Sequence, residues 1–412
     1  MRPIRVWAML LGIAKAVVEA VEVDDQGAVV VSVRPRRSER NRCGRCRRRA
    51  PRYDAGEGRR RWRALDVGLS SAYLEAEAPR VTCPTHGVVV AAVPWARHDA
   101  RFTRTFEDQV AWLAANTAKS AVAQLMLVTW RTVGGIVRRV VAEARTRTDP
   151  FATLRRIGID EVSWRKGKKY LTVVLDHDTG RLIWAAAGAD EKTLEAFFDL
   201  LGEERCAQIA LVSADGASWI SNVVRRRCPQ AHQCTDPFHV VQWATDALDE
   251  VRREVWNAAR RNKQVALAKS LKGARWVLWR NPENLTERQT ARLEEIAQTN
   301  QPLYLAYLLK EQLRLVFQLP ADEAIALLGN WVTWAQASGL EPFVKLAATI
   351  VVYQQRIEAG LLHGLSNARV ESLNAKIRLI IRRGFGFHDA KAITALAMLS
   401  LGGLCPPLPG RA

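Results

Sequence analysis

Apolar and polar residues alternate in two short stretches near the N-terminus, 17–23 and 29–33, which are separated by the polar turn 24–27. Side chains two positions apart share one face of a β-strand, and a short turn that contains glycine connects antiparallel strands. The pattern therefore predicts a β-hairpin. Residues 72–81 have a similar strand-like pattern.

The spacing becomes helical over residues 103–145, where apolar residues recur three and four positions apart. Thr103 or Thr105 can cap the first helix, because a threonine hydroxyl accepts a hydrogen bond from a backbone N–H of the first turn. The predicted helices span 106–115, 119–126 and 130–144. The last two fit a helix-turn-helix whose second helix enters the major groove of DNA, but a plain helical hairpin with a solvated arginine face gives the same pattern. The predicted DNA contacts on the second helix are Arg131, Arg138 and Arg139.

From residue 156 three strand patterns follow one another, and strands then alternate with helices. The predicted strands are 156–160, 169–175, 182–187, 209–214 and 231–235, and the predicted helices are 192–201, 219–227 and 240–253. Three consecutive strands followed by this alternation predict an α/β fold with a mixed sheet covered by helices.

Residues 254–358 lose the strand pattern and contain long helical patterns, which are broken at Asn281-Pro282 and Gln301-Pro302. The segment is therefore predicted to be an all-α insertion, after which helical periodicity resumes at 368–381. The insertion is rich in tryptophan, and we assign these side chains to its core rather than to a ligand-binding surface. They are Trp256, Trp276, Trp279, Trp331 and Trp334.

Charge changes this picture, because 61 lysines and arginines oppose 42 acidic residues and give a formal net charge of +19. The hydrophobic content of 48% is ordinary for a globular protein and excludes a chain that is disordered throughout. Residues 34–63 alone hold fourteen arginines and three acidic residues. A block of one charge favours a polyanionic partner, nucleic acid before an anionic membrane surface. The predicted phosphate contacts are Arg47, Arg48, Arg49, Arg59, Arg60 and Arg61.

Cysteine and histidine spacing predicts a structural zinc site. Cys43 and Cys46 form one pair with two residues between its members, and Cys83 and His86 form a second. Together they make a Cys₃His set, which Zn²⁺ accepts in tetrahedral geometry. The alternative is two incidental turns that carry free thiols.

The seven cysteines are an odd number in a long chain, which argues against an extracellular disulfide framework. The apolar N-terminal stretch 6–13 weakly resembles a signal peptide, but Lys15 and Glu19 interrupt the apolar run early, so we assign it to the core. The uncharged run 392–404 ends well short of a membrane span. A soluble, cytoplasmic protein is therefore expected.

Three acidic residues are candidates for metal-dependent chemistry at phosphorus. Asp160 and Asp215 each follow an apolar strand, and carboxylates on neighbouring strands can hold divalent ions such as Mg²⁺ for in-line displacement. Glu371 lies on a predicted helix that starts near Ser366. Helical spacing places four polar residues of this helix in one stripe, which a solvated surface would equally explain. They are Asn367, Glu371, Asn374 and Arg378.

Other residues compete for these roles. Glu161 adjoins Asp160 but should point to the opposite side of the strand. Asp236, at the end of a predicted strand, is the second choice for an active-site acid. His239 could bind phosphate or orient a water, or it could be satisfied by backbone groups at the start of a helix. The cysteines without ligand partners are predicted to be buried thiols: Cys206, Cys228 and Cys234.

Several short motifs stand out between residues 158 and 387. They are Gly158-Ile159-Asp160-Glu161, Val212-Ser213-Ala214-Asp215-Gly216, Cys234-Thr235-Asp236-Pro237-Phe238-His239, Ser366-Asn367-Ala368-Arg369-Val370-Glu371-Ser372-Leu373-Asn374 and Arg382-Arg383-Gly384-Phe385-Gly386-Phe387. In combination they resemble the DDE insertion-sequence transposases of the ISL-three family. The resemblance implies a ribonuclease H-like core interrupted by an α-helical insertion, and a triad that binds Mg²⁺ or Mn²⁺. The motifs place this triad at Asp160, Asp215 and Glu371.

The resemblance also implies an N-terminal zinc module and a helix-turn-helix. The expected function is a transposase that binds the terminal repeats of its element and catalyses metal-dependent cleavage and strand transfer into double-stranded target DNA, as a homo-oligomer on DNA. A ribonuclease H-like nuclease without strand transfer and a zinc-dependent DNA-binding regulator are the alternatives. The expected domains are a zinc-binding module at 1–100, the helix-turn-helix at 101–148, the catalytic core at 149–253, the all-α insertion at 254–358 and the rest of the core at 359–412.

Overall fold

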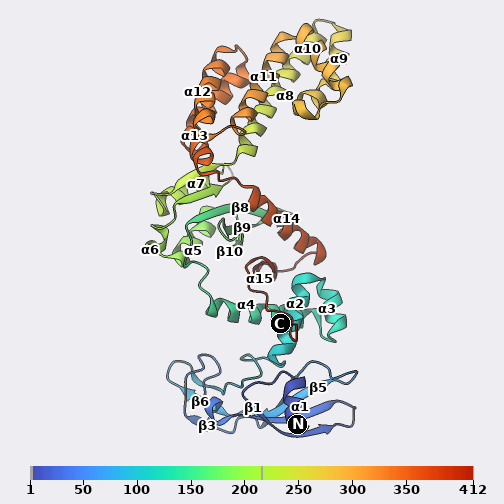
Figure 1. Cartoon of the computed structure of the whole chain (residues 1–412), viewed down its shortest axis with the longest axis vertical. Helices are drawn as coiled ribbons and strands as arrows, with labels where there is room; N and C mark the ends of the chain where they lie inside the picture. The colour runs from blue at the N-terminus through green and yellow to red at the C-terminus, as the bar shows by residue number, and fades with distance from the viewer. Residues whose placement is uncertain (1–2, 215–216, 412) are drawn as a thin grey trace. The chain divides into compact units, whose positions relative to one another are not determined.

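The computed structural model describes residues 3–214 and 217–411. It divides the chain into two compact units, the first formed by residues 1–149 together with 379–412 and the second by residues 150–378. Figure 1 traces the elements of each unit. The predicted segment 359–412 is thus split, because its last 34 residues group with the N-terminal part of the chain.

Two small sheets form the N-terminal part of the first unit. The predicted hairpin is confirmed, since its two strands pair antiparallel. Its second strand pairs in parallel with β5, which lies in the chain between the two predicted pairs of zinc ligands. The first sheet has the order β1-β2-β5-β4 and follows α1, and the second has the order β3-β6-β7. The elements are α1 (Pro3–Leu10), β1 (Ala16–Val23), β2 (Val29–Pro35), the 3₁₀ turn η1 (Arg37–Glu39), β3 (Arg52–Asp54), β4 (Arg59–Arg63), β5 (Ala72–Glu77), β6 (Arg80–Cys83) and β7 (Gly87–Val90).

Four helices complete the first unit: α2 (Arg104–Asn116), α3 (Lys119–Leu125), α4 (Trp130–Arg147) and α15 (Ala390–Leu401). Thr103 caps α2 by accepting a hydrogen bond from the Phe106 backbone N–H, and Thr129 caps α4 in the same way. The three helices predicted at 103–145 are confirmed. The apolar helix α15 packs on α2 and α4, which explains why the C-terminal residues belong to this unit.

Among the described residues no single helix is long and apolar enough to cross a membrane. The pair α3 and α4, with a bend of 102° between them, is long and apolar enough only when the two helices are taken together.

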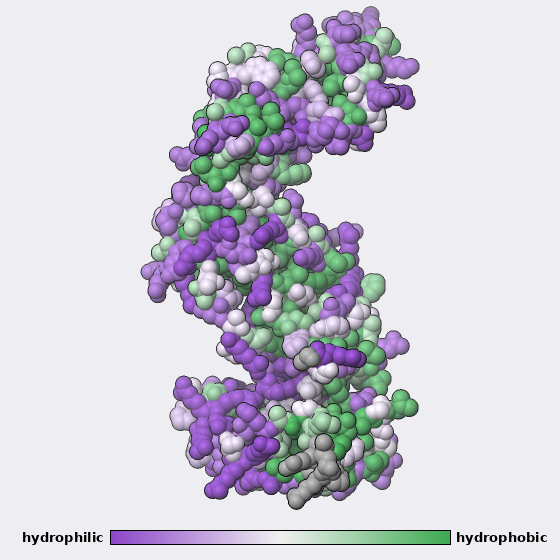
Figure 2. All heavy atoms as spheres, viewed as in Figure 1, coloured by the Kyte–Doolittle hydropathy of each residue, from purple (hydrophilic) through white to green (hydrophobic). Residues whose placement is uncertain are grey.

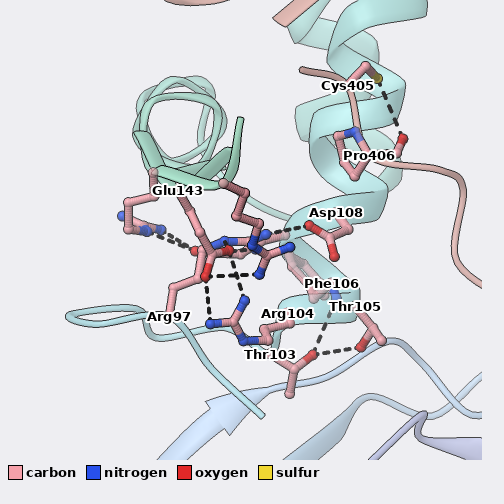
Figure 3. A network of polar contacts seen from close by, with 12 residues as sticks. Arg97, Thr103, Arg104, Thr105, Phe106, Asp108, Glu143, Cys405 and Pro406 are labelled. Carbon is pink, nitrogen blue, oxygen red and sulfur yellow. Dashed lines mark hydrogen bonds and ion pairs between the residues drawn. The ribbon is translucent and has the colours of Figure 1, made fainter. Parts of the chain in front are cut away.

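A network of ion pairs fixes the helices of the first unit (Figure 3). Arg97, which precedes α2, pairs with the buried Glu107 at 3.2 Å, with Asp108 at 2.6 Å and with Glu143 of α4 at 2.7 Å. Arg104 also pairs with Glu143 at 2.7 Å. Partial burial opposes the ionisation of Glu143, but these arginines lower its pKa to about 2.

The Glu143 cluster should make the stability of the first unit depend on pH. A carboxylate whose pKa is lowered by folding stabilises the protein above its unfolded pKa of 4.5, and this contribution is lost as the pH falls toward 2. We expect Glu143→Gln to lower the free energy of unfolding by about 2 kcal/mol at pH 6, a value between those of exposed and fully buried ion pairs. At pH 3 the loss should be much smaller. Urea unfolding at both pH values, with the exposed Glu22→Gln as control, measures the difference. An equal cost at both pH values would contradict the expectation.

The second unit contains a five-stranded mixed sheet of order β10-β9-β8-β11-β12, which confirms the predicted mixed sheet. β10, β9 and β8 pair antiparallel, while β8, β11 and β12 pair in parallel. Phe197 and Phe198 are fully buried in the core that helices form on the sheet. The elements are β8 (Arg156–Arg165), β9 (Lys169–Asp176), β10 (Leu182–Ala187), α5 (Glu191–Leu201), α6 (Glu203–Cys206), β11 (Leu211–Ala214), α7 (Ser218–Arg227) and β12 (His232–Thr235).

The rest of the second unit is helical, as predicted, but the helix predicted at 240–253 continues past the expected boundary at 254, because α8 extends to Arg261. Trp331 is buried and its indole N–H donates to the Leu309 carbonyl at 2.8 Å. Trp276 is 69% exposed, so its assignment to the core is wrong. The elements are α8 (Pro237–Arg261), α9 (Val265–Leu278), the 3₁₀ turn η2 (Pro282–Asn284), α10 (Glu287–Thr299), α11 (Gln301–Val316), α12 (Ala321–Ala337), α13 (Glu341–His363) and α14 (Ala368–Arg383), the last of which crosses into the first unit at residue 379.

Candidate functional site

Asp160 lies in the middle of β8, not at its end as the pattern predicted, because β8 continues to Arg165 as a hairpin with β9. What ends near Asp160 is the parallel pairing with β11, whose last residue, Ala214, pairs with Ile159. The half-buried carboxylate accepts hydrogen bonds from Glu161 and Asn374. Its Oδ1 accepts from the Glu161 backbone N–H at 2.7 Å, and its Oδ2 accepts from the side-chain amide of Asn374 at 2.6 Å.

Asn374 belongs to α14, the helix that carries Glu371. The predicted polar stripe on this helix is not a solvated surface, because Asn367 and Asn374 are 1% and 2% exposed while Glu371 and Arg378 are exposed. The side-chain oxygens of both asparagines are buried and accept no hydrogen bond from any described residue. The exposed Glu371 is therefore about one helical turn along the chain from each of two asparagines whose buried side-chain oxygens have no hydrogen-bond donor in the described part of the chain.

A glycine in β8 allows α14 to approach the sheet. A Cβ added to Gly158 would lie 2.5 Å from Cγ2 of Val370 and 2.9 Å from Nε2 of His177. No real side chain tolerates contacts this short, so a residue with a side chain at this position would displace the helix. Gly158 therefore sets the distance between the strand of Asp160 and the helix of Glu371.

His177 is a buried residue of this site that the sequence analysis treated only as part of a turn. Its Nε2 is 2.8 Å from the Ser213 hydroxyl of β11, and its carbonyl accepts a hydrogen bond from Arg369 of α14. Burial, together with the charges of Arg369 and Arg156, lowers its pKa to about 4, so the ring is neutral at pH 7. The short sequence Asp176-His177-Asp178-Thr179-Gly180 indicates a turn and contains no signal for this contact.

The second predicted acid, Asp215, lies outside the described residues. Its competitor Asp236 is described. Asp236 is 4% exposed, and its Oδ1 accepts from the backbone N–H of Asn367 at 3.3 Å, so it links the end of β12 to the start of α14. His239 is half-buried in the first turn of α8, with its ring 5.9 Å from that of Phe238.

The four predicted zinc ligands come together in the first unit. The ligand atoms of Cys43, Cys46, Cys83 and His86 all lie within 4.8 Å of one another. The His86 ring nitrogen Nδ1 is 3.6 Å from the sulfurs of Cys43 and Cys83, and this contact lowers the pKa of Cys83 to about 6. Three soft sulfur ligands and one imidazole in a closed cluster fit a structural Zn²⁺. Cys206, Cys228 and Cys234, which were predicted to be buried thiols, are buried. Burial raises the pKa of Cys228 to about 12 and that of Cys234 to about 11.

The arginines of the basic block differ in what they contact. Arg59 and Arg61 on β4 both bind Glu75, each at 2.8 Å. Arg60 donates to the Ala100 carbonyl and stacks on Trp62. Arg47 is half-buried, whereas the side chains of Arg48 and Arg49 are exposed, and neither forms an ion pair with a described acidic residue. In Figure 2 hydrophilic residues gather over the part of this unit that holds β3 and β6.

The three arginines of α4 that were predicted to contact DNA also differ in their burial and in their partners. Arg139 is half-buried and pairs with the buried Glu107, with its Nε 2.9 Å from Oε1. That ion pair connects α4 to α2 and gives Arg139 a structural partner. Arg131 and Arg138 are exposed and line the same cavity.

Comparisons with known proteins agree with this arrangement. Residues 157–396 match the family model of the ISL3 DDE domain, described as a transposase, and residues 91–141 match the helix-turn-helix domain of transposase family ISL3. Residues 39–86 match the zinc finger of the transposases of IS204, IS1001, IS1096 and IS1165.

Among curated relatives, the transposase for insertion sequence element IS1557 from two strains of Mycobacterium tuberculosis, CDC 1551 / Oshkosh and ATCC 25618 / H37Rv, is 53% identical over 100% of this chain and 98% of the relative. The transposase for IS1001 from Bordetella parapertussis is 28% identical over 80% of this chain and 81% of the relative. The matched domains define a DDE transposase with a zinc finger and a helix-turn-helix. The chain belongs to the ISL3 family of these enzymes.

Proposed function

We propose that this transposase binds the terminal repeats of its insertion sequence through the first unit, and that it cleaves DNA and joins it to a target at Asp160, Asp215 and Glu371. The observation that carries the proposal is the Asp160–Asn374 hydrogen bond, which joins the central strand of the sheet to the helix of Glu371. The strand order, three antiparallel strands extended by two parallel ones, supports assigning the core to the ribonuclease H-like class. We also propose that residues 149–253 and the last acid on α14 form the catalytic core, interrupted by the all-α insertion, while residues 379–412 group with the first unit.

The residues of this site fit a divalent cation. Mg²⁺ prefers oxygen ligands and keeps several of its waters, so it needs few protein ligands. Asp160 and Glu371 supply carboxylates, and the buried side-chain oxygen of Asn374 lacks a hydrogen-bond donor among the described residues. A bound Mg²⁺ or Mn²⁺ would neutralise charge on the phosphate and activate the attacking oxygen. Asn374 orients the Asp160 carboxylate, and Gly158 and Asp236 fix the position of α14.

The experiment uses the purified full-length protein, DNA that carries the ends of its element, a target plasmid, and Mg²⁺ or Mn²⁺. Cleavage at the ends followed by products joined to the plasmid is the expected result. Cleavage without joined products would favour the nuclease alternative. Specific binding of the ends without cleavage would favour the regulator. Sedimentation of the protein with and without end DNA tests the proposed homo-oligomer.

The exposed arginines should set the dependence of DNA affinity on salt. Each neutralised phosphate contributes about −0.9 to the slope of log K against log salt. We expect the double variant Arg48→Ala/Arg49→Ala to flatten the slope by about 2. The matched variant Arg59→Ala/Arg61→Ala should change it less, because both arginines already pair with Glu75 and Arg61 also pairs with Asp24. Titrations at several salt concentrations measure both slopes, and a larger effect of the second variant would contradict this assignment.

A further inference from the structure

A cavity of about 1140 Å³ lies within the first unit, between α3, the N-terminal half of α4 and the turn 383–389. It contains neither the zinc ligands nor the proposed catalytic acids. Its walls come from segments of the chain more than 240 residues apart, so no local motif indicates it. The residues that line it combine exposed aromatic rings with positive charge, and each property restricts what can bind there.

Two aromatic side chains of the cavity are exposed to an unusual degree. Phe385 is 89% exposed and Trp130 is 54% exposed, although folded proteins normally bury such side chains. The Trp130 ring also lies near a third ring, that of His388, with centroids 6.3 Å apart. The Arg131 guanidinium lies 5.5 Å from the centroid of the Trp130 ring and covers part of it. The exposed part of that ring and the Phe385 ring are what a planar ligand group can reach.

The turn that carries Phe385 is held in a strained conformation. Phe385 has a φ of +51°, in the left-handed region that bulky residues rarely adopt. A Cβ on Gly384 would lie 2.8 Å from the Phe387 ring, so the turn depends on glycine there to pack against that ring. The ammonium of Lys119 lies 5.0 Å from the centroid of the same ring. Strain of this kind is found where a side chain is held for binding, and here it holds Phe385 outward.

The charge of the cavity is positive. Lys119, Arg131 and Arg138 line it. Arg383 also lines it, but donates to the Ala115 carbonyl at the end of α2, at 2.7 Å. Among the described lining residues Asp389 is the one acid, and its carboxylate caps α15 by accepting from the Lys391 N–H. The partner should therefore carry negative charge.

We propose that this cavity binds unpaired nucleotides of DNA, whose bases stack on Trp130 and Phe385 while Arg131 and Arg138 contact the phosphates. Exposed aromatic rings interleaved with cations are the usual surface for single strands, because an unpaired base offers a free face for stacking. The bases of an intact duplex stack on each other, and phosphate contacts alone would need no aromatic rings. The proposal rests on the proposed DNA-binding function and adds to it a site for single-stranded flanks beside a cut or a melted end.

The test measures affinity of the full-length protein by fluorescence anisotropy for two labelled probes, an oligothymidylate of about 20 nucleotides and a blunt duplex of the element end. We expect Trp130→Ala and Phe385→Ala each to weaken binding of the single strand by about fivefold or more, and to change duplex binding less than twofold. Trp130→Phe should retain most of the affinity, because it keeps an aromatic face. The control is Trp276→Ala, which removes a tryptophan that is 69% exposed in the second unit.

The outcomes separate this proposal from the proposed function. Suppose that the wild-type protein binds the duplex and that both alanine variants bind the single strand with wild-type affinity. The cavity proposal is then wrong and the proposed function stands. If the wild-type protein binds neither probe, both are wrong. If the variants instead reduce self-association in sedimentation experiments and leave single-strand binding unchanged, the cavity is a protein interface and the proposal is overturned.

Discussion

Glu371→Gln and Asp160→Asn are each expected to reduce cleavage of end DNA about 10³-fold. In the proposed site a metal ion held by the two carboxylates would contribute several kcal/mol to stabilising the transition state, and each 1.36 kcal/mol is a tenfold change in rate. Affinity for the ends should stay within about twofold of wild type, since DNA binding is assigned to the first unit. Gel assays of cleavage and binding with the same labelled DNA measure both effects.

Two further variants make this prediction specific. Glu161→Gln changes the acid next to Asp160 and should leave cleavage nearly intact. Asp236→Asn keeps an oxygen that can accept from the Asn367 N–H, so we expect at most a tenfold loss. Cleavage at the wild-type rate by Glu371→Gln would remove that residue from the triad. An inactive Asp236→Asn together with an active Asp215→Asn would make Asp236 the second acid.

Removing zinc is expected to unfold the module that carries the arginine block. Apparent binding free energies of structural zinc are about 10–16 kcal/mol. This is as large as the whole free energy of unfolding of a small domain, so the β3-β6-β7 sheet should not stay folded without the ion. Cys46→Ser should lower the zinc content from one ion per chain to near zero and abolish specific binding of end DNA. Metal analysis and binding titrations measure the two effects.

The second unit provides the control for the zinc prediction, because none of the four ligands belongs to it. Its urea transition should be nearly unchanged in Cys46→Ser. Cys405→Ser, which changes a half-buried cysteine outside the cluster, should keep the zinc. Wild-type protein that is purified without chelators and contains no zinc would refute the site.

Local patterns were sufficient for much of the fold. The hairpin β1–β2, the helices α2 to α4 and the strands of the mixed sheet follow from alternation, helical spacing and threonine caps, all of which act over a few residues. The zinc cluster was predicted for the same reason, since each pair of ligands lies within one turn and only the meeting of the two turns depends on the fold.

Contacts between distant residues were not predictable in this way. Asn374 is 214 positions from Asp160, and nothing near either residue indicates that they form a hydrogen bond. The sequence left the nature of the polar stripe on α14 open, because helical spacing shows which residues share a face but not which face is buried. Arg139 was assigned to DNA from its charge and helix position, while its partner Glu107 lies 32 positions away.

Short motifs and local spacing carry enough information to identify the family of this protein, the four cysteine and histidine residues that cluster, and much of the order of its secondary structure. Which side chains of those motifs are buried, and which arginines are already paired, depends on the tertiary structure. Tertiary packing also places the turn with Phe385 beside α3 and α4, and it places the C-terminal helix α15 against α2 and α4 in the first unit. The physical reason is that burial and ion pairing depend on packing between segments, which the spacing within one segment does not specify.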